Sequence, residues 1–236
     1  MIPRLVTFDC ANTMVAVPDG WSMGWFAGSC ARHIGLDPTL TDEAIYQAMY
    51  VKRLPEFLEV NLARDSERQA AFWARLAEDW LRETNLPMSS LPRMHEAAEE
   101  LGFGPRSILF NLYDDVVPCL NLLDSLGVRA AVVSNWDYSL HRVLRMFGLY
   151  DRFVVVKASL EEGVEKPDPR LFQIALEEAG FSPGETLHVG DDPIDDIEGA
   201  AAACIRSVRI DRSLDRTTRP SIRTLSDLPE AFGWID

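Results

Sequence analysis

Polar side chains stand where several short apolar runs of the sequence end, or just before the next helix begins. These positions are Asp9, Ser134, Lys166, Asp191 and Asp192. Open α/β sheets bind their ligands at the carboxyl ends of their parallel strands, which meet at one edge. Asp9 is the predicted nucleophile of a site there, because a carboxylate can form a covalent intermediate. The alternative, that Asp9 only caps a loop, weakens because three further segments repeat the pattern.

Short strands that alternate with helices must position these side chains. Strands are predicted over residues 5–8, 128–133, 153–156, 186–189 and 207–210, and helices over 118–126, 139–147, 169–179 and 195–204. Asp168 is the expected N-cap of the helix over 169–179. The alternation predicts an α/β fold with a doubly wound parallel sheet, which is a Rossmann-like core.

A helical block interrupts this alternation from Trp21 to about residue 98. Four helices are predicted there, the second capped by Thr41 and the third carrying Trp73, Leu76 and Trp80 on one face. We expect that face to pack inside a helical core. The block separates the first strand from the rest of the sheet, so residues 1–17 and 102–236 are predicted to form the core domain and residues 18–101 a helical domain.

Composition narrows the classes of partner. The 236 residues carry a net charge of −14, and such a surface repels nucleic acid and anionic membranes, so neither is expected to bind. No apolar run approaches 18 residues, and the first strand begins too early to leave room for a signal peptide. The cysteines at 10, 30, 119 and 204 are too scattered for a metal site, which favours free thiols and a cytoplasmic location.

Arginines gather near the carboxyl end, at positions 206, 209, 212, 216, 219 and 223. We interpret them as a solvated face that balances the acidic surface. A contact from one of them to a phosphate stays open as the alternative.

Four motifs in a fixed order carry a resemblance to a known family. They are Phe8–Met14 (FDCANTM), Val133–Asp137 (VSNWD), Glu165–Asp168 (EKPD) and Val189–Ile197 (VGDDPIDDI). Their order and spacing resemble the haloacid dehalogenase-like hydrolase superfamily across nearly the whole chain. The helical block resembles the four-helix cap of that family. The second motif is similar to that of one branch of haloacid dehalogenase-like proteins, which includes human domain-containing proteins whose substrates are unassigned.

The resemblance implies phosphoryl transfer through an intermediate on Asp9, with Mg²⁺ as the cofactor and a small phosphorylated or similar anionic compound as the substrate. Mg²⁺ would offset the repulsion between the carboxylate and the phosphoryl group. The implied metal ligands are Asp9, the carbonyl of Ala11 and Asp191. The cap would close over the substrate and exclude water.

Further roles follow from the same resemblance. Lys166 would neutralise the nucleophile and the incoming phosphoryl group as a second catalytic residue, and the implied phosphate-binding residues are Thr13, Ser134 and Asn135. Around them, Asp192 is expected to support the metal, Asp196 to orient Lys166 or the metal ligands, and Asp195 to cap a helix.

One position departs from the family pattern. The phosphatases of the family carry an acid/base aspartate two residues after the nucleophile, where this chain has Ala11; losing such a group costs about 10²–10⁴-fold in rate. A Mg²⁺-dependent phosphatase is the favoured interpretation. The alternatives are cleavage of a carbon–phosphorus bond, with Lys52 of the cap as a Schiff base, or of a carbon–halogen bond, and a non-catalytic protein that binds a metal, a ligand or a partner protein.

Overall fold

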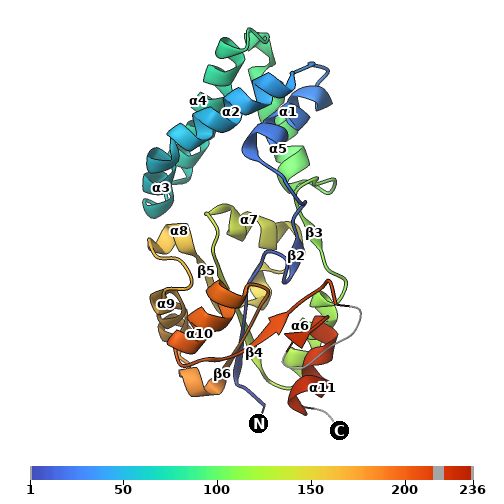
Figure 1. Ribbon diagram of the computed structural model, residues 1–236, viewed down its shortest axis with the longest axis vertical. Coiled ribbons are helices and arrows are strands. Elements are labelled where there is room, and N and C mark those ends of the chain that lie inside the picture. The colour runs from blue at the N-terminus through green and yellow to red at the C-terminus, as the bar shows by residue number, and fades with distance from the viewer. Residues whose placement is uncertain (1, 215–220, 235–236) are drawn as a thin grey trace. The chain divides into compact units, whose positions relative to one another are not determined.

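The computed structural model describes residues 2–214 and 221–234, which form two compact units (Figure 1). One unit combines residues 1–16 with 112–236, and the other consists of residues 17–111. The domain boundary expected at residues 101 and 102 falls inside α5 (Leu91–Phe103). The strands β2 (Val15–Ala16) and β3 (Asn111–Leu112), which pair in a separate two-stranded sheet, lie where the chain passes between the units.

A six-stranded parallel sheet forms the centre of the first unit, in the order β5–β4–β1–β6–β7–β8. Its strands are β1 (Leu5–Phe8), β4 (Arg129–Ser134), β5 (Val156–Ala158), β6 (Thr186–Gly190), β7 (Arg206–Ile210) and β8 (Ser221–Ile222). In β1, Phe8 is in register with Val132 of β4 and Val189 of β6. All four residues of β1 are buried, as expected for a strand whose sheet is covered on both faces.

Helices cover both faces of this sheet. They are α6 (Val116–Ser125), α7 (Ser139–Met146), α8 (Ser159–Glu162), α9 (Pro169–Ala179), α10 (Gly199–Ala202) and α11 (Leu228–Phe232), with short helices η2 (Tyr150–Arg152), η3 (Pro183–Glu185), the π-helical turn η4 (Pro193–Glu198) and η5 (Leu225–Asp227). Figure 1 shows α9 and α10 on one side of the sheet and α6 and α11 on the other. Phe172 of α9 packs with Leu5, Val133 and Ala200 in one buried cluster. The predicted doubly wound α/β core is confirmed.

Two elements of this unit differ from the sequence prediction. The strand expected over 153–156 is β5, which begins at Val156 and places Lys157 inside the sheet. The Lys157 ammonium lies 3.0 Å from Glu162 and 2.7 Å from Glu178, so its charge is paired. The helix expected over 195–204 begins earlier, as η4 followed by α10.

The second unit is helical. Its helices are α1 (Met23–His33), α2 (Leu40–Lys52), α3 (Leu54–Leu62), α4 (Ser66–Glu83), the short η1 (Met88–Ser90) and α5. The sequence predicts four α-helices, and the described residues 17–111 contain five, because Pro55 fits only the first turn of a helix and separates α3 from α2. Thr39, rather than Thr41, caps α2, in a capping box with Asp42.

The predicted aromatic face of α4 is buried in the helical unit. Trp80 is fully buried, its ring meets Tyr46 edge to face at 5.5 Å between centroids, and its indole N–H donates to the carbonyl of Asp42 at 2.6 Å. Leu76 and Leu81 of the same helix are also fully buried, and Trp73 is half-buried. Within the described part of the chain, no helix has both the length and the apolar surface that a bilayer crossing requires.

Candidate active site

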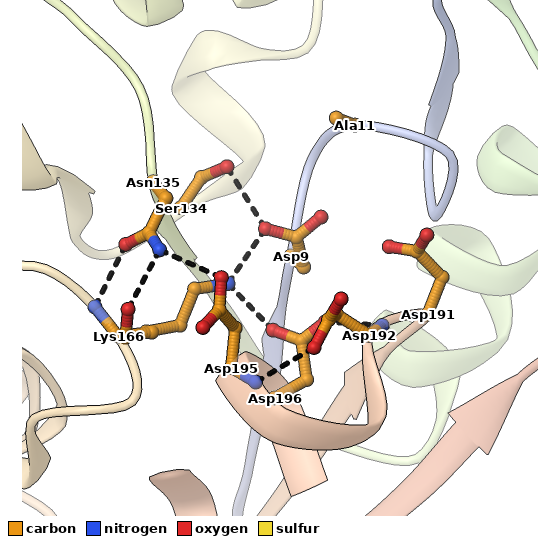
Figure 2. Close-up of a pocket in the computed structure, with 9 residues that line it drawn as sticks. All are labelled: Asp9, Ala11, Ser134, Asn135, Lys166, Asp191, Asp192, Asp195 and Asp196. Atoms are coloured by element: carbon orange, nitrogen blue, oxygen red, sulfur yellow. Dashed lines mark hydrogen bonds and ion pairs between the residues drawn. The ribbon is translucent and has the colours of Figure 1, made fainter.

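The predicted polar residues meet at the carboxyl edge of the sheet, around a cavity of about 190 Å³ (Figure 2). The cavity is lined by Asp9, Ala11, Ser134, Asn135, Lys166, Asp191, Asp192, Asp195 and Asp196. Because β4, β1 and β6 are neighbours in the sheet, Ser134, Asp9 and Asp191 emerge beside one another although they are far apart in sequence.

The Asp9 carboxylate is fixed by two donors on one oxygen. The Ser134 hydroxyl donates to Oδ1 at 2.9 Å, and the Lys166 ammonium donates to the same oxygen at 2.7 Å. Figure 2 shows the other oxygen turned toward the side of Ala11 and Asp191. Burial raises the pKa of the Asp9 carboxyl above its usual range, although the Lys166 charge opposes that shift. The carboxylate therefore has one oxygen held and one directed toward the cavity.

Lys166 joins two buried carboxylates. Its ammonium lies 2.7 Å from Asp9 and 2.5 Å from Asp196, and its side chain is 1% exposed. Burial alone would lower the pKa of Lys166, but the charges of Asp9 and Asp196 outweigh burial and raise it. Lys166 is therefore a permanent cation whose position is set from two sides.

Asp196 is the most fully bonded of the acids. Its Oδ1 accepts from Lys166 and lies 3.1 Å from His188 Nε2, while its Oδ2 accepts from the backbone N–H of Asp192 at 2.9 Å. Burial raises the pKa of Asp196, but the donors His188 and Lys166 outweigh it, and the net pKa lies below the usual range. Asp196 thus contacts Lys166 directly, and its role in orienting Lys166 or the metal ligands stays a prediction.

His188 and Thr7 extend the network beyond the cavity lining, and neither of them is predicted from the sequence. His188 Nδ1 lies 2.9 Å from the Thr7 hydroxyl, and both side chains are fully buried. Thr7 of β1 and His188 of β6 are register partners. Two polar residues in otherwise apolar strands are the signal that could have indicated this contact.

Three carboxylates come close enough to share a cation. One oxygen each of Asp9, Asp191 and Asp196 lies within 4.8 Å of the other two. Burial, followed by the charges of Asp9 and Asp196, raises the pKa of Asp191 to about 6. Such mutual repulsion is what a bound cation would relieve, and carboxylate oxygens are the ligands that Mg²⁺ prefers.

Asn135 braces the loop that carries Lys166. Its amide oxygen accepts from the Lys166 backbone N–H at 2.8 Å, and its amide nitrogen donates to the Lys166 carbonyl at 2.9 Å and to Asp195 at 3.0 Å. These bonds position Lys166 through its backbone. Phosphate binding by Asn135 stays a prediction, since its amide has these partners.

The cap of η4 corrects one sequence expectation. Asp192, not Asp195, is the N-cap, because its Oδ1 accepts from the backbone N–H groups of Ile194 at 2.7 Å and Asp195 at 2.8 Å. Burial, with the nearby Asp192 charge, raises the pKa of Asp195. Four acids within six residues left the choice open in the sequence, and the backbone of the turn decides it.

Ala11 and Thr13 lie on the turn after Asp9. Ala11 lines the cavity with a methyl group only. Thr13 is fully buried, does not belong to the cavity lining, and its hydroxyl has no hydrogen-bond partner in the described part of the chain. Metal binding by the Ala11 carbonyl and phosphate binding by Thr13 stay predictions.

Lys52 of the helical unit and the arginines near the carboxyl end have different surroundings. Lys52 is exposed on α2 of the helical unit. Arg209 donates to the carbonyl of Asp191 at 3.0 Å, and Arg212 donates to the carbonyls of Asn12 and Thr13. The interpretation as a solvated face is therefore wrong for Arg212, whose side chain is 16% exposed, whereas the Arg209 side chain is 42% exposed and also pairs with Asp211 at 3.4 Å. Residues 216 and 219 lie outside the described residues.

Comparison with known proteins agrees with this fold. The sequence matches the family described as haloacid dehalogenase-like hydrolase over residues 3–203. It is 38% identical over 241 residues to the human haloacid dehalogenase-like hydrolase domain-containing protein 3, which covers 96% of this chain and 90% of that one. The protein therefore belongs to the haloacid dehalogenase-like hydrolases.

Two further similar proteins have different named activities. The phosphoserine phosphatase of Thermus thermophilus is 38% identical over 127 residues, which is 52% of this chain and 51% of that protein. The chain thus spans about half the length of that relative. A solved 2-haloacid dehalogenase of Pseudomonas syringae superposes with a TM-score of 0.62 and 26% identity over the whole of both chains.

Proposed function

We propose that the protein is a Mg²⁺-dependent phosphatase that acts on a small phosphorylated compound through an aspartyl-phosphate on Asp9. The observation that carries the proposal is the Asp9 carboxylate, held by Ser134 and Lys166 on one oxygen at the mouth of an acidic cavity. Relatives named as phosphatases support the reaction class. We further propose that the helical unit acts as the cap of this site.

The residues around the cavity fit a divalent cation. Five carboxyl groups and one ammonium line the cavity, and those of Asp9, Asp191 and Asp196 bring one oxygen each within 4.8 Å of the other two, so a divalent cation would relieve an excess of negative charge. Asp9, Asp191 and the Ala11 carbonyl are the residues that would hold it. When bound, Mg²⁺ supplies charge neutralisation and orientation of the phosphoryl group. Asp196 already accepts three hydrogen bonds, so its part is to hold Lys166.

The chain's own residues divide the remaining tasks. Lys166 and Ser134 hold the Asp9 carboxylate so that its free oxygen can attack a phosphoryl group, and the same two donors would contact the equatorial oxygens as charge develops there. The Asp9 oxygen forms a bond to phosphorus as the bond to the leaving oxygen breaks, and water then attacks phosphorus and breaks the bond to Asp9, which releases phosphate. Ala11 has no proton to give to the leaving oxygen, so the leaving group departs as an anion and takes its proton from water.

The test separates the nucleophile from the missing acid. Purified protein with Mg²⁺ is assayed on an aryl phosphate, whose phenolate leaves with little protonation, and on an alkyl phosphate, whose alkoxide needs a proton. We expect aryl phosphate turnover that disappears in Asp9→Asn. Ala11→Asp is expected to raise alkyl phosphate turnover by up to about 10²–10⁴-fold. Absence of turnover in both the parent and Ala11→Asp would contradict the proposal.

A further inference from the structure

The turn that follows Asp9 is unusually tight. The N–H of Thr13 donates to the carbonyl of Ala11 at 2.6 Å, and the N–H of Asn12 donates to the carbonyl of Val15 at 2.7 Å. Between them, Asn12 has a φ of 53°, in the left-handed region that few non-glycine residues adopt. Asparagine adopts this region more readily than most residues, and contacts from outside the turn can fix it further.

Arg212, which lies outside the turn, binds two of its backbone carbonyls. Its Nε donates to the carbonyl of Asn12 at 3.2 Å, and its Nη2 donates to the carbonyl of Thr13. The two carbonyls belong to the positive-φ residue and to the residue that follows it, and they lie about two hundred residues away from Arg212 in sequence. A planar guanidinium can reach both at once, because its donors form a rigid fork.

Arg212 is itself locked in place. Asp115 accepts from Nη1 at 3.0 Å and from Nη2 at 3.1 Å, and the ring of Tyr113 lies 3.6 Å from the guanidinium carbon. Asp115 also accepts from the backbone N–H of Leu225 at 2.8 Å. The Arg212 side chain is 16% exposed and that of Asp115 is 12% exposed, so the pair is largely withdrawn from water.

We propose that Arg212 is a positioning residue of the active site, which holds the turn over residues 10–15 so that the Ala11 carbonyl and the Asp9 carboxylate keep their places. The functional part of this inference rests on the proposed phosphatase activity. Lysine cannot replace arginine here, because one ammonium cannot bridge two backbone carbonyls while binding both oxygens of Asp115. If the ion pair between Arg212 and Asp115 were purely structural, its loss would destabilise the fold without changing the turn.

The variants are Arg212→Ala and Arg212→Lys, with Arg152→Ala as the matched control. Arg152 also pairs with an aspartate, Asp124 at 2.7 Å, but its contacts lie on α6 and not on the turn. Hydrogen exchange of the peptide that covers residues 10–15 reports on the turn directly. Its amides at Met14 and Val15 are bonded to the carbonyl of Cys10 at 2.9 Å and should exchange slowly in the parent.

We expect faster exchange of that peptide in both Arg212 variants and no change in Arg152→Ala. Removing a residue that supports metal-binding groups typically costs 10–100-fold in activity or metal affinity, so kcat on an aryl phosphate should fall by about that factor, with substrate KM little changed. The half-saturating Mg²⁺ concentration should rise. Added guanidinium should restore part of the activity of Arg212→Ala and none in Arg212→Lys.

Each outcome decides one part of the inference. Unchanged exchange of residues 10–15 in Arg212→Ala would overturn it whatever the activity, because the turn would then hold itself. Faster exchange with unchanged kcat and Mg²⁺ dependence would also overturn it, since the turn would not matter to the site. If the parent has no phosphatase activity, the proposed function fails, while the exchange experiment still decides whether Arg212 holds the turn.

Discussion

Replacing Lys166 by methionine removes the positive charge that joins the two most buried acids of the site. Methionine has nearly the length of lysine, so the change is chiefly one of charge. The Lys166 side chain is 1% exposed, and its partners Asp9 and Asp196 are 8% and 1% exposed. Neither carboxylate can exchange the lost ammonium for bulk water without a rearrangement of the loop.

The magnitude follows from that burial. Deleting one partner of a buried ion pair typically costs about 3–5 kcal/mol, because the remaining charge is left uncompensated. This loss is a large share of the roughly 5–15 kcal/mol that stabilises a folded protein. With an m-value of about 2–3 kcal/mol/M, the urea midpoint should fall by about 1–2.5 M. Activity on an aryl phosphate should fall as well, because Asp9 loses its cation.

The pKa of Asp9 determines how the stability loss of Lys166→Met changes with pH. Burial already raises the pKa of Asp9, and loss of Lys166 removes the charge that opposes this shift. A carboxyl whose pKa is raised in the folded state contributes stability below its unfolded pKa, near 4, and loses that contribution as the pH rises through the folded value. The deficit of Lys166→Met should therefore be greatest near neutral pH and shrink as the pH falls toward 4.

The assay is urea unfolding in EDTA over this pH range, followed by aryl phosphate turnover with Mg²⁺. Lys157→Met is the matched control, because Lys157 is also buried and paired with two glutamates, of which Glu178 is 57% exposed. It should lose stability and keep its kcat. A Lys166→Met protein within about 1 kcal/mol of the parent at neutral pH, or a deficit independent of pH, would refute the reasoning.

Two further substitutions test the supports of this network. His188→Leu removes a donor to the charged Asp196 and leaves the buried Thr7 hydroxyl without its partner. The free energy of unfolding should therefore fall by about 1.5–3 kcal/mol. His188→Gln should recover part of this loss, and urea midpoints measure both variants. Asp192→Ala removes the cap of η4 and should cost about 1 kcal/mol in thermal or urea unfolding, while Asp192→Asn keeps a capping oxygen and should restore the loss; equal effects of the two would show that charge, and not capping, is the role of this side chain.

The strand-end residues could be placed from the sequence because two simple rules apply to them. Apolar runs of four to six residues predict buried strands, and parallel strands deliver their following residues to one edge. Asp9, Ser134 and Asp191 follow β1, β4 and β6, which are neighbours in the sheet. The rules need no knowledge of side-chain contacts, and so they placed these residues together correctly.

The supporting residues escaped prediction because their partners are distant or numerous. Arg212 is one of six arginines in a short stretch, and nothing local indicates that it binds carbonyls of Asn12 and Thr13. Asp192 and Asp195 carry the same chemistry three residues apart, and only the conformation of η4 decides which of them caps. Which of several similar side chains makes a contact depends on the backbone geometry, and the type of a single residue does not determine that geometry.

The contacts around Asp9 leave one oxygen of its carboxylate open. On one side, Thr7, His188, Asp196 and Lys166 form a continuous chain of polar contacts that ends on Asp9 Oδ1. The remaining oxygen is turned toward the side of Ala11 and Asp191 (Figure 2). On the proposed function, a phosphoryl group would meet Asp9 on that side, which is also the side of a carboxyl introduced at position 11. For this reason Ala11→Asp is the substitution most able to add a proton donor without disturbing the contacts that hold the nucleophile.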